Sequence, residues 1–105
     1  MNNVYIMSAN RSAIGGFGGT LKNHCPVDLG TLVAKEAIAR SGFEANEVEH
    51  AVFGNVIHTE PRDMYVSRVI ALQAGMDKAS AALTVNRLCG SGLQAIVSAS
   101  QIIML

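Results

Sequence analysis

The sequence predicts an α/β protein in which strands and helices alternate in the order βαβαβα around a parallel sheet. Short apolar runs alternate with stretches of helical periodicity. The run Ala51–Ile57 has no polar face, which is typical of a strand buried on both sides. Half of the 105 residues are hydrophobic and only 15% are charged. Because one small domain buries about two thirds of its unfolded surface, so low a charge indicates that something else covers part of this one.

The first βα unit combines a strand at Val4–Ser8 with a helix that opens at Pro26. The loop Ala9–Gly19 between them carries four glycines, a composition that favours irregular backbone. Proline suits the first turn of a helix, and Asp28 lies near the positive end of the helix dipole. Gly42 is a good terminator after the last apolar position.

The two later βα units follow at short intervals. We expect a second strand within Val48–Ile57, the loop His58–Asp63, a helix over Met64–Leu72, a third strand at Ala82–Asn86 and a helix over Gly92–Leu105. The parallel order requires each helix to cross over a face of the sheet.

The third helix carries no charge, because no charged residue occurs from Leu88 to Leu105. An apolar helix without a solvent face predicts burial after the third strand. It reaches Leu105 without a cap, so we expect residues 1–105 to be a partial domain of a longer protein.

Composition excludes several classes of function. The eight basic and eight acidic side chains balance and the basic ones form no cluster, which argues against a nucleic-acid partner. No apolar stretch reaches the roughly 20 residues of a membrane span, and no targeting segment is visible. Two cysteines without a CxxC pair exclude a disulfide framework and a zinc ribbon. We expect a cytoplasmic protein with free thiols and no bound metal.

Cys89 is the strongest candidate for chemistry. It stands between a strand and a helix and precedes Gly90-Ser91-Gly92, where small side chains let a substrate approach the sulfur. Unpaired N–H groups at a helix start favour the thiolate. The strand–turn–helix setting resembles a nucleophile elbow with cysteine in place of serine. The alternative is a small buried core residue, which is what most free cysteines are.

The other titratable residues are weaker candidates. His58 follows the second strand at the carboxyl side of the sheet and is the histidine that we consider as a base for Cys89. His24 and His50 show no metal-ligand spacing, and Cys25 beside His24 forms no obvious dyad.

Further polar residues have ordinary interpretations. The Gly15–Gly19 loop matches neither GxGxxG nor a P-loop, so a phosphate-binding role is weak. We interpret Glu60, Arg62 and Asp63 as solvated loop charges. Arg68 either makes a pairing, within the protein or with a partner, or lies along the protein surface.

Three segments resemble the thiolase family. Asn86–Ile96, with the sequence NRLCGSGLQAI, resembles the family's nucleophile motif; Arg11–Leu21 resembles its first loop, and Phe53–Val56 its second strand. The segments occur in family order and spacing. Thr59–Tyr65 is most similar to the broad-specificity β-ketothiolases, although Tyr65–Arg68 departs from the Asn-Pro-x-Arg of many thiolases.

The resemblance implies acyl transfer between coenzyme A thioesters, such as acetyl-CoA and 3-ketoacyl-CoA, in fatty acid metabolism. It implies that Cys89 attacks the thioester carbonyl, becomes acylated, and offers its backbone N–H to the oxyanion. No covalently bound cofactor is implied. An apolar surround of Leu83, Leu88, Leu93 and Ile96 would keep water from the thioester.

The family's other acid/base groups lie in Asn-Glu-Ala-Phe, Gly-His-Pro and Cys-x-Gly-Gly-Gly motifs, none of which occurs in these residues. The coenzyme A loop is absent too, so residues 1–105 correspond to the opening part of an N-terminal half-domain and are expected to be inactive alone. The resemblance also implies a dimer or tetramer, with Ala82–Asn86 near an interface.

Three other interpretations remain open. The chain could be a non-catalytic α/β fragment with an inert Cys89, or a thiol redox sensor that uses Cys89. The third and weakest alternative is a decarboxylating condensing enzyme. Alkylation by iodoacetamide separates the inert thiol from the reactive one, and acylation by an acyl-CoA separates the thiolase from the redox sensor.

Overall fold

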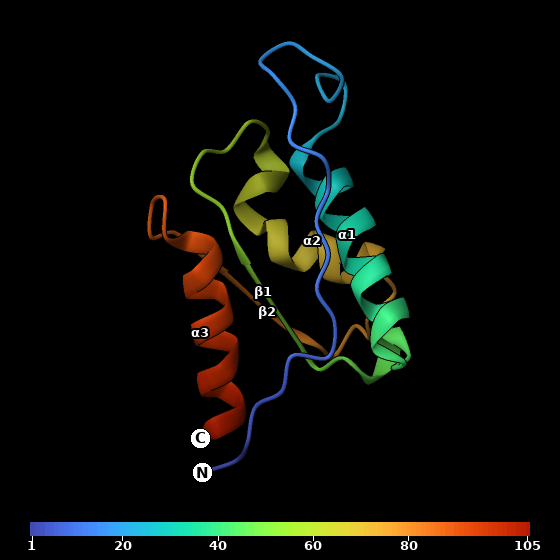
Figure 1. The fold of residues 1–105 in the computed structure, drawn as a ribbon, viewed down its shortest axis with the longest axis vertical. Coiled ribbons are helices and arrows are strands. Elements are labelled where there is room, and N and C mark those ends of the chain that lie inside the picture. Colours follow the sequence, from blue (N-terminus) through green and yellow to red (C-terminus); the bar gives the residue numbers. More distant parts are fainter.

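A two-stranded parallel sheet forms the centre of the computed structural model, which describes all of residues 1–105. Helix α3 packs on one face of the sheet, and α2 packs on the other with α1 beside it (Figure 1). In chain order the elements are α1 (Pro26–Ser41), the short 3₁₀ turn η1 (Ala45–Glu47), β1 (His50–Gly54), the 3₁₀ turn η2 (Pro61–Tyr65), α2 (Val66–Gln73), β2 (Ala81–Val85) and α3 (Ser91–Met104).

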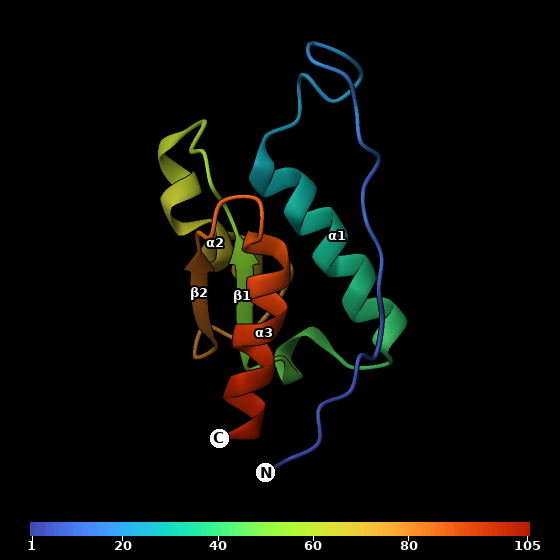
Figure 2. The same ribbon diagram turned by 60° about the vertical axis from the view of Figure 1, so that its left-hand side comes forward.

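The strands β1 and β2 pair in parallel through the crossover of α2. Their register runs from His50 opposite Ala81 to Gly54 opposite Val85, and the N–H of Asn55 donates to the Val85 carbonyl at 3.0 Å. Both strands therefore end at the same edge of the sheet, from which the chain continues into the η2 loop and the β2–α3 turn (Figure 2). The predicted βαβ order of the chain's second half is confirmed.

Helix α1 begins and ends where its sequence predicts. Pro26 occupies the first turn together with Asp28, and Gly42 closes the helix in the left-handed region at φ 81°. The packing of α1 against α2 depends on Gly30, because a Cβ there would overlap the Cδ1 of Ile70. The side chains of Val27, Val66 and Ile70 form the core between these helices.

Residues 4–8 do not form a strand, which corrects the prediction of a first strand at Val4–Ser8 and leaves two of the three expected strands. The N-terminal segment instead runs along α1 (Figures 1 and 2), where Ser8 Oγ donates to the Ala37 carbonyl at 2.8 Å and Asn10 Nδ2 to the Val33 carbonyl at 3.1 Å. A strand is defined by its hydrogen-bonded neighbour, and no strand of this structure lies beside the segment. An apolar pattern cannot reveal whether such a neighbour is present.

Helix α3 is mostly exposed, so the expectation that it is a buried helix is wrong for this structure. Only Ser91 and Ala95 are buried, whereas Leu93 and Ile96 are 67% and 56% exposed. A sheet of two strands offers α3 a single narrow face, which covers one stripe of the helix and no more. Although α3 is charge-free, neither it nor another helix is long and apolar enough to cross a membrane.

Candidate active site

Cys89 lies in the turn between β2 and α3. This turn is at the edge of the sheet where both strands end (Figure 2). Its thiol is free and exposed. Gly90 is the N-cap residue of α3, so the sulfur belongs to the residue just before the cap. The carboxyl edge of a parallel sheet is where ligands of α/β proteins bind, and the structure places the predicted nucleophile there.

Leu88 gives this turn its shape. With φ at 49°, it is the one non-glycine residue of the chain in the left-handed region, a conformation that is uncommon for leucine. Its N–H donates to Asn86 Oδ1 at 3.0 Å, and its carbonyl accepts the N–H of Ser91 at 3.1 Å. The N–H of Gly90 donates to the Arg87 carbonyl at 3.0 Å and closes the turn.

Three backbone N–H groups around the turn remain free of backbone partners. The bonds that close the turn and start the helix use the N–H groups of Gly90 and Ser91 as donors, but not those of Cys89, Gly92 or Leu93. The N–H groups of Gly90 and Ser91, directly after the nucleophile, are therefore engaged within the turn. The N–H of Cys89 itself is a free donor beside the thiol.

The apolar surround predicted for the thiol is not closed. The side chains of Leu83, Leu88, Leu93 and Ile96 are each more than two fifths exposed, from 41% for Leu83 to 68% for Leu88. Water reaches Cys89 in this structure, so exclusion of water from a thioester requires a further surface against this edge.

None of the histidines forms a hydrogen bond with the Cys89 thiol. Hydrogen bonds around Cys89 come from Asn86, Arg87 and Ser91, and none involves His58, which is exposed in the loop after β1. His50 lies within β1 and its Nε2 is buried without a partner. The prediction of His58 as the base for Cys89 gains no support from this geometry.

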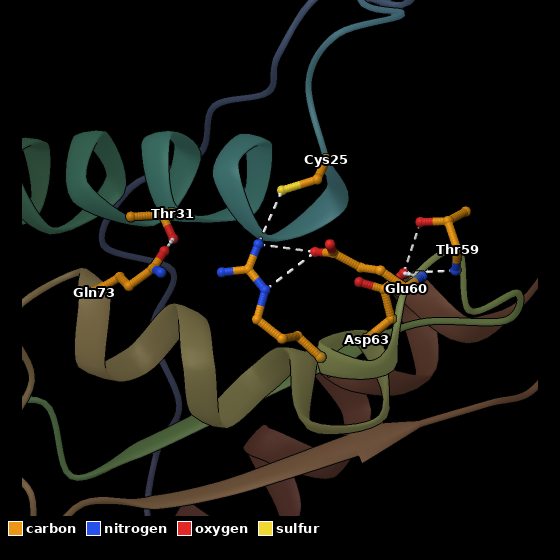
Figure 3. A network of polar contacts seen from close by, with 7 residues as sticks. Cys25, Thr31, Thr59, Glu60, Asp63 and Gln73 are labelled. Carbon is orange, nitrogen blue, oxygen red and sulfur yellow. Dashed lines mark hydrogen bonds and ion pairs between the residues drawn. The ribbon is translucent and has the colours of Figure 1, made fainter.

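Cys25 belongs to a different cluster, at the start of α1 (Figure 3). Its sulfur accepts a hydrogen bond from Arg62 at 3.6 Å, and Arg62 pairs with Glu60 at 2.9 Å. The N–H of Asp28 lowers the pKa of the Cys25 thiol, but the hydrogen bond and charge of the Asp28 carboxylate together with desolvation outweigh it and raise that pKa. Hydrogen bonding to Glu60 and the charge of that carboxylate raise the pKa of Arg62.

Asp63 is fully buried, which corrects its interpretation as a solvated loop charge. Its Oδ2 accepts the N–H and hydroxyl of Thr59 at 2.7 and 2.8 Å, and the N–H of Glu60 at 3.1 Å (Figure 3). The Thr59 hydroxyl, followed by these N–H groups, lowers the pKa of the Asp63 carboxyl despite desolvation. The signal was present in the sequence, because an acidic residue three positions after Glu60 with Pro61 between them has helix-cap spacing.

The polar contacts of α2 hold the helix to both strands. Ser67, which our sequence reading passed over, accepts the N–H of Phe53 at 3.1 Å and donates to the Leu83 carbonyl at 2.8 Å. Arg68 donates to the carbonyls of Ser80 and Lys78 at 2.7 and 2.8 Å. Of the two alternatives for Arg68, internal pairing is the one that the structure shows.

Comparison with known proteins identifies the family. The family model described as "Thiolase, N-terminal domain" matches residues 4–105. The chain is 59% identical over 102 residues to Beta-ketothiolase BktB of Cupriavidus necator, covering 97% of this chain and 26% of that protein. It is 36% identical over 101 residues to the human mitochondrial 3-ketoacyl-CoA thiolase, covering 96% of this chain and 25% of the relative.

Solved thiolase structures share the fold. The Acat5 thiolase from Ascaris suum in complex with coenzyme A matches 95% of this chain and 26% of its own, with a TM-score of 0.88 and 33% identity. The acetyl-CoA acetyltransferase of Bacillus anthracis matches 94% of this chain and 25% of its own, with a TM-score of 0.86 and 42% identity. The chain thus spans about a quarter of the length of the relatives it matches, and it belongs to the thiolase family, within whose N-terminal domain it lies.

Proposed function

We propose that this chain supplies the nucleophile for acyl transfer between coenzyme A thioesters, and that Cys89 is this nucleophile. The observation that carries the proposal is the exposed Cys89 thiol, which stands beside its own unpaired N–H at the carboxyl edge of the sheet. Relatives named as β-ketothiolase and 3-ketoacyl-CoA thiolase support this class of reaction. Two matching thiolase structures are complexes with coenzyme A, which supports coenzyme A thioesters as substrates.

The first half-reaction requires a thiolate and a donor for the oxyanion. The Cys89 sulfur attacks the carbonyl carbon of an acyl-CoA, and the carbonyl electron pair moves onto oxygen, where the Cys89 N–H donates to it. Collapse of the tetrahedral species breaks the bond to the coenzyme A sulfur. The products are an acyl thioester on Cys89 and the coenzyme A thiolate, which takes up a proton from water.

Completion of the cycle requires a second acid/base group. None of the three histidines of the chain hydrogen-bonds to Cys89, and Cys25 lies in the separate cluster with Arg62. Loss of one general acid or base typically slows a reaction by about 10²–10⁴-fold. We therefore propose that the 105-residue chain is acylated slowly and does not turn over steadily.

The test is intact-mass analysis after incubation with acetyl-CoA, followed by peptide mapping. We expect one acetyl group on Cys89, and none in a Cys89→Ser variant. Cys25→Ala is the matched control and should label as the unmodified chain does. An acetyl group on Cys25 alone would refute the assignment of Cys89 as the nucleophile. Alkylation of Cys89 by iodoacetamide without acetylation would favour the thiol redox sensor instead. Sustained thiolysis of a 3-ketoacyl-CoA would refute the claim that the chain lacks a second acid/base group.

We further propose a cytoplasmic homo-oligomer that acts in fatty acid metabolism. Two free cysteines are typical of a reducing compartment. The exposed apolar side chains along α3, among them Leu93, Ile96 and Ile103, form the kind of surface that a partner subunit covers. Sedimentation at micromolar concentration should give a dimer or larger species, and a clean monomer would contradict the proposal.

A further inference from the structure

The hydroxyl of Ser91 makes two hydrogen bonds across the turn that carries Cys89. It donates to the Leu88 carbonyl at 2.6 Å and accepts the N–H of Arg87 at 2.8 Å. We propose that Ser91 is a positioning residue, which holds Leu88 in the left-handed region and thereby aims the backbone N–H of Cys89 at a developing oxyanion. This inference rests on the proposed function of Cys89.

The geometry of one peptide unit links Ser91 to Cys89. The Leu88 carbonyl and the Cys89 N–H belong to the same planar trans peptide, so they point in opposite directions. The Ser91 hydroxyl and the Ser91 N–H both donate to that carbonyl, at 2.6 and 3.1 Å. Because both groups lie in this plane on opposite sides of the C–N bond, fixing the direction of the carbonyl fixes that of the N–H. Hydrogen bonds to a carbonyl also polarise the N–H of the same unit.

The left-handed conformation of Leu88 needs such support. Leucine at φ 49° is uncommon and carries strain that the surroundings must offset. Leu88 is 68% exposed, so side-chain packing does little to hold it. Its restraint comes from polar contacts, namely the two donors from Ser91 and the acceptor Asn86 Oδ1 at 3.0 Å from the Leu88 N–H.

Ser91 is itself fixed by the end of β1. The residue is 5% exposed, and it lies against Gly54, where an added Cβ would stand 2.7 Å from the Ser91 Cβ. The sheet therefore holds Ser91, Ser91 holds Leu88, and Leu88 sets the direction of the Cys89 N–H. The sulfur of Cys89 takes no part in this chain of contacts, so Ser91 acts on the oxyanion donor rather than on the thiol.

The test compares two reactions of Cys89 in Ser91→Ala. Acetylation by acetyl-CoA passes through an oxyanion, whereas alkylation by iodoacetamide is a displacement at carbon that does not. We expect acetylation to slow at least about tenfold, since loss of an oxyanion donor costs about 10²–10³-fold, while alkylation changes less than about twofold. Ser100→Ala is the matched control, because Ser100 Oγ also donates to a carbonyl of α3, that of Ile96 at 2.8 Å, away from the turn.

Amide hydrogen exchange provides a readout that does not depend on acylation, and its first measurement uses the unmodified chain alone. In the unmodified chain the Arg87 amide should be protected by the Ser91 hydroxyl, and the Cys89 amide should exchange freely. In Ser91→Ala the Arg87 amide should lose its protection. Rapid exchange of Arg87 in the unmodified chain would overturn the inference.

The remaining outcomes separate the two proposals. Equal losses of acetylation and alkylation in Ser91→Ala would reveal a merely structural serine, and unchanged acetylation would show that the hydroxyl does not aim the donor. Either result overturns the positioning role while the nucleophile stands. If the unmodified chain is alkylated at Cys89 but never acetylated, the proposed function fails, and Arg87 exchange then decides by itself whether Ser91 holds the turn.

Discussion

Gly54 and Ser91 meet so closely that a Cβ on Gly54 would stand 2.7 Å from both the Cβ and the carbonyl carbon of Ser91. The last residue of β1 thus abuts the first residue of α3. No side chain fits between them, and this contact sets how near α3 approaches the sheet at the end where Cys89 lies.

Substitution of Gly54 by alanine should therefore separate α3 from β1. We expect Gly54→Ala to reduce the free energy of unfolding by about 1–3 kcal/mol, as overpacking typically does. Urea unfolding followed by circular dichroism measures the change. Gly16→Ala is the control, since a Cβ there meets nothing within 4 Å. Equal stability of the two variants would contradict the close approach.

Removal of the Ser67 hydroxyl should destabilise the attachment of α2 to the sheet. In Ser67→Ala the Phe53 N–H and the Thr84 hydroxyl, which donate to Ser67 at 3.1 and 2.9 Å, lose their acceptor. Unsatisfied buried groups cost about 1–3 kcal/mol, and we expect a loss of that size in urea unfolding. Ser98→Ala is the control, because the half-buried Ser98 hydroxyl on α3 accepts a hydrogen bond only from Gln94, and it should change stability far less.

The buried carboxylate of Asp63 should make stability depend on pH on the acid side. Because folding lowers the pKa of Asp63, its contribution is complete above the unfolded pKa of about 3.9 and is lost as the pH falls through the lower folded value. We expect the stability difference between the unmodified chain and Asp63→Asn to be large near pH 7 and to shrink below about pH 4.

Thermal unfolding at a series of pH values measures this difference. Glu36→Gln serves as the control, because Glu36 forms an exposed ion pair with Arg40 and such pairs contribute little. A difference between the unmodified chain and Asp63→Asn that stays constant from pH 7 to pH 3 would show that the Asp63 charge has no role in stability.

The two thiols should differ in their reaction with iodoacetamide. Cys89 is exposed, whereas Cys25 is half-buried under Arg62 and its pKa is raised, which leaves less thiolate near neutral pH. We expect Cys89 to be alkylated first, as peptide mapping of briefly treated protein would show. Asp28→Asn removes the carboxylate that raises the Cys25 pKa. In this variant Cys25 should be alkylated faster, and the alkylation rate of Cys89 should be unchanged. Preferential labelling of Cys25 in the unmodified chain would contradict this order.

The residue pattern alone was sufficient for the α/β class, the limits of α1, the two paired strands and the place of Cys89 before α3. Each of these depends on local chemistry: proline and glycine at the helix ends, an apolar run long enough for a strand, and small residues after the nucleophile. The thiolase family could be recognised from the same local motifs, and the comparisons confirm it. The role of Cys89 as nucleophile stays a prediction.

Tertiary structure decided what the pattern could not. Whether Val4–Ser8 is a strand depends on a neighbour for its backbone, and whether α3 is buried depends on the width of the sheet beneath it. Asp63 is an acidic residue but is buried, and the N–H groups of Thr59 and Glu60 donate hydrogen bonds to its carboxylate. Ser91 and Leu88 matter through hydrogen bonds that form only once the turn exists. Burial and pairing are properties of contacts between distant segments, and a linear pattern specifies only one side of each contact.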